Sequence, residues 1–332
     1  MNGNILYFYK LKTQKPLSPT AMKCSIVVAN YNHADVLTQA LGSIEQQTYT
    51  NWEVVIVDDG STDNSLAVIN DYLANVQDPK KYKLVHLSDN IGLPRAKHLC
   101  VINSSGEVVA ICDPDDMLHA EAVEKVMQAH MHSPNASVVF TNMYRCSPDM
   151  SICEICQEAG PVLFNNLLEN KISAFASFKR EAYDKTSGFD PNLTLGSDQD
   201  LYYKLEEVGD VVYINEPLYY YRIWPRGVSQ GFDNYVRSRD FKLIAVKNAI
   251  QRRQLSGVKM PSKKEIRVLL SEIHLLQAEG LMYSQQDLGR KFIKHLGLSI
   301  LYNPIGNLTR KIKTAFLLSR IKRNLMKASG EA

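Results

Sequence analysis

The sequence lacks any long hydrophobic run. No stretch of its 332 residues approaches the roughly 18 consecutive apolar residues that a membrane-spanning helix needs. The first 22 residues also lack the continuous apolar core of a signal peptide. These two absences predict a cytoplasmic protein. With 45% hydrophobic and 22% charged residues, the composition is that of a globular chain with one large domain plus an appendage.

Two common nucleotide-binding motifs are missing as well. The apolar run at 24–30, which is expected to form the first strand, leads into the sequence ANYNHADV, which contains no glycine. The glycine-rich turn of a dinucleotide-binding Rossmann fold is therefore absent. No Walker motif is present either. A Rossmann dehydrogenase and a P-loop enzyme are both disfavoured.

Cysteine is scarce and scattered along the chain. The six cysteines are Cys24, Cys100, Cys112, Cys146, Cys153 and Cys156. In a chain of this size we expect them to be reduced thiols. The last three lie close enough in sequence for a zinc site, but no fourth Cys or His follows at a regular spacing, so zinc is the weaker interpretation.

What the chain does contain is an alternation of apolar runs and amphipathic stretches. Strands are expected within 24–30, 52–63, 82–87 and 107–112, and helices within 34–47, 64–73 and 94–104. This alternation predicts an α/β fold built from parallel β-α-β units, with helices on both faces of an open sheet. Ligands of such sheets bind at the carboxyl ends of the strands.

Acidic residues gather where these strands are expected to end. Asp58 and Asp59 follow the second strand, and Asp113, Asp115 and Asp116 follow the fourth. Carboxylates this close raise one another's pKa, so a positive partner is expected. Their hard oxygen atoms suit Mg²⁺ or Mn²⁺, which would bridge them to a nucleotide diphosphate. Capping of the next helix by one of these acids is the plainer alternative, but a cap accounts for one Asp only.

Three segments together resemble glycosyltransferase family 2, a large family of inverting transferases with the GT-A fold. The segments are residues 25–65, 89–116 and 188–205, and the similarity runs from about Cys24 to about Ser229. The resemblance implies a GT-A domain, which is a Rossmann-like open mixed sheet with helices on both faces. It also implies a nucleotide-sugar donor and a sugar acceptor.

The resemblance assigns the donor site to particular residues. Ala29 and Tyr31, after the first strand, would hold the nucleotide base, with the Tyr31 ring available for stacking. Asp59 would accept a hydrogen bond from the base, and Asp58 would support the turn. Lys97 stands where many relatives carry an arginine, and it could meet phosphate as a point charge. A solvated lysine on the helix surface is an equal alternative.

The resemblance also implies metal ligands and a general base. Asp113 would contact the ribose or the metal shell, and Asp115 would ligate Mg²⁺ or Mn²⁺ directly. Asp198, in a motif where Ser197 replaces the usual Glu, would take the proton of the acceptor hydroxyl. The alternative is that Asp198 and Asp200 only place negative charge at a helix N-terminus, and Asp200 is the second candidate for the base.

The implied reaction is transfer of a sugar with inversion, since a single base opposite the leaving group needs no covalent intermediate. The expected donor is a UDP-sugar, and the expected acceptor is a glycan or lipid-linked molecule in surface polysaccharide or lipopolysaccharide assembly. The QxxRW signature of processive synthases is absent, which favours transfer of one or a few residues at a time. No nucleic-acid partner is expected. The rival hypothesis is a non-catalytic member that binds nucleotide sugar or glycan as a regulatory module.

The C-terminal third has a different character. We expect an N-terminal extension at 1–22, a GT-A domain at 23–232 and a helical, basic region at 233–332. From Gly289 onward the sequence contains ten Lys or Arg residues and one acidic residue, Glu331. This part therefore carries a net charge of +9, although the whole chain carries only +3. An imperfect apolar stripe between these cations suggests a helix on a membrane surface, at the cytoplasmic leaflet. The alternative is a helix packed on its own domain with a solvated basic face.

The segment that joins these two regions, at 217–231, is expected to be a strand followed by a loop. Its residues Tyr221, Arg222 and Trp224 resemble the family's closing segment over the active site.

Overall fold

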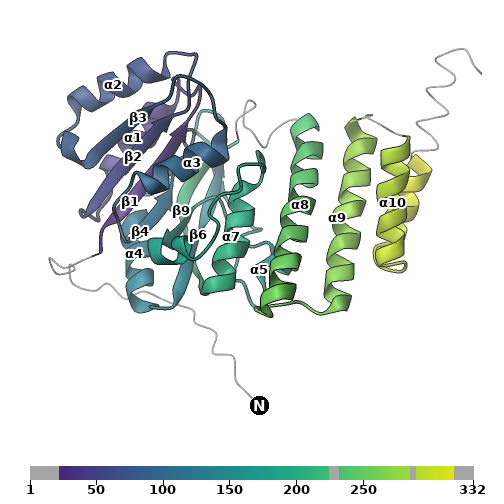
Figure 1. Ribbon diagram of the computed structural model, residues 1–332. Coiled ribbons are helices and arrows are strands. Elements are labelled where there is room, and N and C mark those ends of the chain that lie inside the picture. The colour runs from purple at the N-terminus through teal and green to yellow at the C-terminus, as the bar shows by residue number, and fades with distance from the viewer. Residues whose placement is uncertain (1–21, 224–231, 285–288, 318–332) are drawn as a thin grey trace, which may run out of the picture.

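The computed structural model describes residues 22–223, 232–284 and 289–317. Within these residues nine strands form one mixed sheet, helices cover both of its faces, and further helices stand in a row beside it (Figure 1). The strands are β1 (Cys24–Asn30), β2 (Trp52–Asp58), β3 (Tyr82–His86), β4 (Val108–Ile111), β5 (Met117–Leu118), β6 (Ala136–Cys146), β7 (Cys153–Ile155), β8 (Ala176–Lys179) and β9 (Asp210–Arg222). The helices are α1 (Leu37–Glu45), α2 (Ser65–Asn75), α3 (Leu93–Ile102), α4 (Ala122–His132), α5 (Asn166–Glu169), α6 (Arg180–Asp184), α7 (Ser197–Val208), α8 (Phe232–Ser256), α9 (Lys263–Ser284) and α10 (Arg290–Tyr302), and residues 308–317 are also helical.

The strand order brings the ends of the predicted strands to one edge of the sheet. The order is β3-β2-β1-β4-β8-β6-β9-β5, with β7 paired to β6. β1 runs parallel to β2 and β4, and β3 runs parallel to β2. β8 lies antiparallel between β4 and β6, which makes the sheet mixed. The predicted fold class is confirmed, and the carboxyl ends of β1, β2 and β4 meet where ligands of such sheets bind.

β1 illustrates why the sheet is covered on both faces. All seven of its residues are buried. Ile26 and Val28 pack into a cluster with α1, α2 and α4, whereas Val27 and Ala29 pack into a second cluster with α3 and α7. Because successive side chains point to opposite faces, a strand covered on both sides has a continuous apolar sequence.

α8 joins the row of helices to the sheet. Tyr203 of α7 packs with Leu243 and Val246 of α8, and α9 adds Leu270 and Ile273 to the same cluster. α10 and the helix at 308–317 follow at the outer end of the row (Figure 1). None of the described helices is long and apolar enough to cross a membrane.

Some predicted features lie outside the described residues. They are the N-terminal extension apart from Met22, Trp224 with most of the expected closing loop, and the last part of the basic tail, from residue 318 onward.

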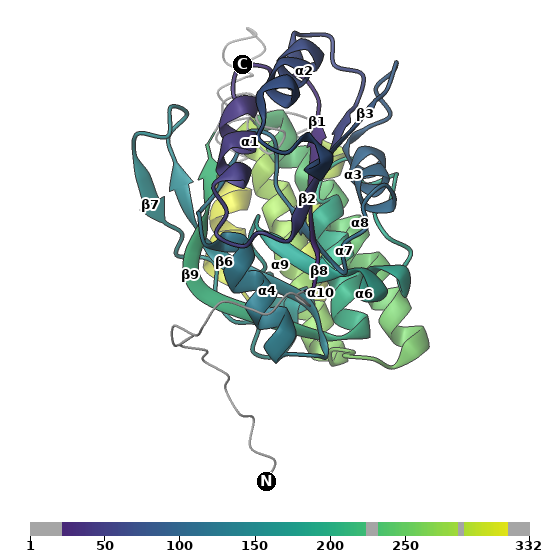
Figure 2. The same cartoon turned by 90° about the vertical axis from the view of Figure 1, so that its left-hand side faces the viewer.

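The expectation of reduced thiols is wrong at two cysteines. Cys146 at the end of β6 and Cys153 at the start of β7 pair across the hairpin and form a disulfide, with their Cα atoms 4.1 Å apart. Figure 2 shows this hairpin at the edge of the molecule. The disulfide also rules out a zinc site made from all three cysteines of this segment. Cys156 is a free, buried thiol whose Sγ donates to Glu158 Oε2 at 2.9 Å. The spacing of cysteines in the sequence could not show the hairpin register that pairs them.

Candidate active site

A cleft of about 530 Å³ opens at the edge where β1, β2 and β4 end. It is lined by the end of β1, by the turns that follow β1, β2 and β4, and by residues of α3, α7 and the end of β9. All the predicted site residues line it, namely Ala29, Tyr31, Asp59, Lys97, Asp113, Asp115 and Asp198. Residues that are up to 169 positions apart in the sequence therefore share one cavity.

The donor side of the cleft is built on the ends of β1 and β2. Tyr31 follows β1 and keeps an exposed ring. Asp59 is buried, and its two carboxylate oxygens accept hydrogen bonds from the backbone N–H groups of Ile91, at 2.8 Å, and Gly92, at 3.0 Å. A carboxylate has about four acceptor sites, so Asp59 can hold this loop and still accept from a ligand.

Asp58 supports the same turn from within the protein. Its fully buried carboxylate accepts from Asn30 Nδ2 at 2.8 Å and Ser61 Oγ at 2.5 Å, and it lies 3.0 Å from His86 Nδ1. Gly60, which follows the two acids, has φ of +66°, and a Cβ there would lie 2.5 Å from the backbone of Asp89. This turn therefore needs glycine, because any side chain would be strained and would collide with the backbone.

Lys97 lies between two acids at the bottom of the cleft. Its side chain is only 2% exposed, and its Nζ lies 3.0 Å from Asp113 Oδ1 and 3.0 and 3.1 Å from the two oxygens of Asp198. The alternative of a solvated surface lysine is therefore wrong. The helical spacing of Lys97 relative to Ala96, Cys100 and Val101 could have predicted its burial, because all four residues share the buried face of α3.

The charges of this triad are mutually dependent. Burial disfavours the Lys97 ammonium, but the carboxylates of Asp113 and Asp198 outweigh burial and raise the pKa of Lys97. The pKa of Asp198 is also raised, mainly by burial and further by Asp113, although Lys97 opposes both effects. Asp198 is thus a carboxylate with increased affinity for a proton, held in place by an ammonium group.

The acid turn at 113–116 carries closely spaced carboxylates. Burial and the neighbouring Asp113 raise the pKa of Asp115. Asp116 is almost fully buried, and burial, together with the two other acids, raises its pKa well above the usual range. The capping alternative is wrong, because α4 begins at Ala122 and the residue at its N-cap is Glu121.

Asp113 and Asp115 fit a divalent cation by their chemistry. They place two oxygen donors of like charge on one turn, and a cation would relieve the crowding that raises the pKa of Asp115. Among the described residues, no group of three or more His, Cys, Asp or Glu side chains is placed to hold a metal ion. Water and substrate phosphates would have to complete the coordination, as is usual for Mg²⁺.

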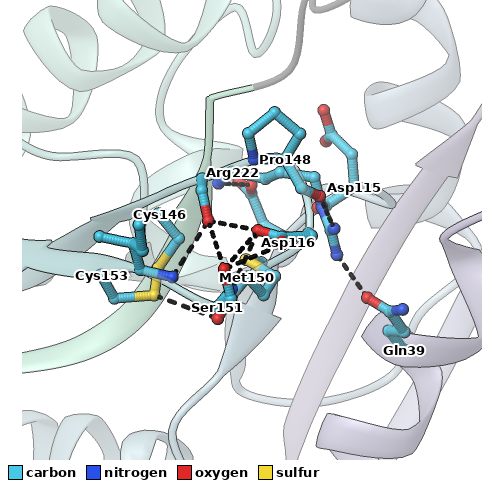
Figure 3. Close-up of a disulfide and its surroundings, with 12 residues drawn as sticks. Gln39, Asp115, Asp116, Cys146, Pro148, Met150, Ser151, Cys153 and Arg222 are labelled. Atoms are coloured by element: carbon cyan, nitrogen blue, oxygen red, sulfur yellow. Dashed lines mark hydrogen bonds between the residues drawn. A yellow bond between two sulfur atoms is a disulfide. The ribbon is translucent and has the colours of Figure 1, made fainter.

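Arg222 holds the acid turn through hydrogen bonds from its side chain and its backbone (Figure 3). This buried side chain donates from Nε to the carbonyl of Asp115 at 2.7 Å, from Nη2 to Gln39 Oε1 at 2.5 Å, and from Nη1 to the carbonyl of Pro148. Its backbone N–H donates to Asp116 Oδ1 at 2.7 Å. The sequence suggested that Arg222 closes over the site, whereas the structure places it as a support of the turn.

Asp200, the second candidate for the base, has a different position. It is fully buried, and its carboxylate pairs with Lys204 at 2.7 Å and with Arg252 of α8 at 3.4 Å. It does not line the cleft, whereas Asp198 does. Asp200 therefore connects α7 to the row of helices.

Comparison with known proteins agrees with this arrangement. A family model described as Glycosyl transferase family 2 matches residues 25–187. Residues 25–187 belong to glycosyl transferase family 2. One family relative is the chondroitin synthase of Pasteurella multocida, which is 27% identical over 235 residues, or 70% of this chain and 24% of the relative. The chain spans less than two thirds of the length of the first curated relatives that it matches.

Two solved structures share the fold of this chain. TarS 1-349 of S. aureus, in complex with UDP-GlcNAc, has a TM-score of 0.57 at 18% identity and covers 85% of this chain and 81% of its own. The mannosyltransferase PcManGT of Pyrobaculum calidifontis, in complex with GDP-Man and Mn²⁺, has a TM-score of 0.55 at 20% identity and covers 93% and 88%. At these identities the likeness concerns the fold alone.

Proposed function

We propose that this chain is an inverting, metal-dependent glycosyltransferase that moves a sugar from a nucleotide-diphosphate sugar to a hydroxyl of a glycan or lipid-linked acceptor. The observation that carries the proposal is the triad of Lys97, Asp113 and Asp198 at the bottom of a single cleft. It joins the acid turn on the donor side to a carboxylate of increased proton affinity. A module that only binds nucleotide sugar has no need of such a carboxylate.

The donor would lie along the ends of β1, β2 and β4. The exposed ring of Tyr31 can stack on the base, Asp59 can accept a hydrogen bond from it, and Ala29 leaves room beside them. Asp113 and Asp115 would hold Mg²⁺ or Mn²⁺ together with the diphosphate. When bound, such an ion supplies charge stabilisation to the leaving diphosphate. TarS binds UDP-GlcNAc on the same fold, which supports a UDP-sugar as donor, and the mannosyltransferase complex supports Mn²⁺.

Asp198 would act on the acceptor. Its raised pKa brings the carboxylate closer to the working pH, where a general base is most effective. As the acceptor oxygen forms its bond to the anomeric carbon, its proton passes to Asp198, and the bond to the diphosphate breaks on the opposite face. Lys97 keeps Asp198 oriented and balances the negative charge of the cleft.

Assembly of a surface polysaccharide is the proposed setting. The relative that synthesises chondroitin supports an acceptor that is itself a glycan. Transfer to a lipid-linked acceptor would place the reaction at the cytoplasmic face of a membrane.

The test separates an enzyme from a binding module. The chain is incubated with a panel of UDP-sugars and GDP-sugars and with Mg²⁺ or Mn²⁺, while calorimetry reports donor binding and a coupled assay reports nucleoside diphosphate. We expect one donor to be hydrolysed slowly in the absence of acceptor, and Asp198→Asn to bind that donor but turn it over about 10²-fold more slowly or worse. Donor binding with no turnover by the unaltered chain, in any combination of metal and sugar, would support the regulatory module instead.

A further inference from the structure

The last described helix, at 308–317, turns polar residues toward the protein and large apolar residues toward the outside. Its polar residues Lys311 and Thr314 are each 2% exposed and face the protein. Its large apolar residues Leu308, Ile312 and Phe316 are between 46% and 69% exposed. A helix of a globular protein normally turns its apolar stripe to the core, so this orientation needs a specific cause.

Polar contacts hold the helix in this orientation. Lys311 Nζ donates to Ser271 Oγ of α9 and to the carbonyl of Ser299 of α10, both at 3.2 Å, and also to the carbonyl of Asn303. Arg310 pairs with Glu272 at 2.6 Å and with Glu279 at 2.5 Å, both on α9. Rotating the helix to bury its apolar stripe would break all these contacts. The outward stripe is thus a consequence of the packing against α9 and α10.

The neighbouring segments add to the exposed apolar surface. α10 exposes Ile293, Ile300 and Leu301, and Ile305 in the connection that follows is 82% exposed. Together with the stripe on the last helix they form the terminal surface: Ile293, Ile300, Leu301, Ile305, Leu308, Ile312 and Phe316. Soluble proteins seldom expose so many large apolar side chains over so short a segment unless the surface is an interaction site.

The charged residues of the segment that carries the terminal surface are all basic. Residues 289–317 contain no Asp or Glu, and Arg290, Lys294 and Lys313 are exposed among the apolar residues. The sequence beyond residue 317 adds four more cations before its first acid, Glu331. An occupant of this surface must therefore be both apolar and anionic.

We propose that the terminal surface docks onto an anionic lipid bilayer. Its apolar side chains would enter the boundary between headgroups and acyl chains, and its cations would contact anionic headgroups. A second copy of the chain is a poorer occupant, because a two-fold interface would bring this basic surface against itself. Docking goes beyond the proposed function, and it requires no sugar transfer to be observed.

The experiment measures sedimentation of the full chain with vesicles of equal parts phosphatidylglycerol and phosphatidylcholine, and with vesicles of phosphatidylcholine alone. We expect binding to the anionic vesicles at low salt and release as the salt approaches about 1 M, where the Debye length falls to about 3 Å. The double variant Ile312→Gln, Phe316→Gln should bind roughly tenfold more weakly or worse, since two large apolar contacts are lost. Lys313→Glu should weaken binding and make it less dependent on salt.

Matched controls keep the result specific. Leu255→Gln alters an equally apolar and 84% exposed side chain in the last turn of α8, and Lys80→Glu reverses an exposed charge just before β3, so both variants should bind vesicles like the unaltered chain. Because all these side chains are exposed, thermal unfolding should be unchanged in every variant. Equal binding by the double variant and the unaltered chain, or no binding by either, would overturn the proposal. So would a chain that self-associates through these residues in sedimentation velocity and ignores vesicles.

Discussion

Replacing Lys97 by methionine tests the charge balance of the cleft most directly. Methionine keeps most of the buried length and removes the ammonium that lies between Asp113 and Asp198. Removal of one partner from a fully buried ion pair costs about 3–5 kcal/mol. Here the two carboxylates are 28% and 34% exposed, so water can solvate them once the ammonium is gone. We therefore expect the free energy of unfolding to fall by about 1–3 kcal/mol near neutral pH.

The pH dependence of this loss identifies its cause. The pKa of Asp198 is already raised in the folded chain, so the stability linked to its protonated form is complete below its ordinary pKa and is lost as the pH rises through the raised value. Without Lys97 that pKa rises further, so the variant loses more stability over a wider range. When Asp198 takes up its proton at low pH, the buried Lys97 ammonium of the unaltered chain loses a charged partner, which lowers the stability of that chain. The difference between the two proteins should therefore shrink or reverse as the pH falls.

Urea denaturation at several pH values measures this difference, and Lys204→Met is the control. Lys204 is buried and pairs with Asp200 away from the cleft, so its loss should lower stability and leave donor binding unchanged. Lys97→Met should impair donor turnover as well. The reasoning is refuted if the stability loss in Lys97→Met is independent of pH, or if this variant turns the donor over like the unaltered chain.

Three further substitutions test individual roles. Asp115→Asn should abolish metal-dependent turnover without lowering the free energy of unfolding, because burial and Asp113 already disfavour its charge; full turnover by the unaltered chain in excess chelator would contradict this. Asp198→Asn should lower turnover by about 10²-fold or more. Asp200→Asn should instead lower the free energy of unfolding. Neither variant should change the donor Kd. Arg222→Lys cannot keep three separate hydrogen bonds to the acid turn and its supports, so it should raise the Mn²⁺ concentration needed for half-maximal turnover, and an unchanged concentration would speak against the support role.

The parallel half of the fold was predictable from local sequence. β1, β2 and β4 are short, β-branched and almost wholly buried, so each appears as an apolar run that ends in polar residues. Parallel sheets bind ligands at the carboxyl ends of their strands, and this rule alone predicts that Asp59 and Asp113 lie in one site. Strand limits and site residues follow here from the same pattern.

The other half depended on pairings that no local pattern encodes. β9 lies beside β6 although more than sixty residues separate them, and β8 enters the sheet between β4 and β6 in the opposite direction. The disulfide follows from one hairpin register, and the support role of Arg222 follows from the position of β9. Each of these features requires knowing which segments meet in space.

The basic C-terminal segment shows the same limit in its sharpest form. The spacing of Ile312, Ala315 and Phe316 already predicts a helix with an apolar stripe, and the count of cations predicts a positive surface. Neither can say which side of the helix faces the protein. That choice is made by Glu272 and Glu279, which lie on a different helix and bind Arg310, so the apolar stripe is left on the outside. If those two acids were replaced by glutamine, the helix would lose the contacts that favour its orientation, and the vesicle binding that we propose should weaken although no residue of the terminal surface has changed.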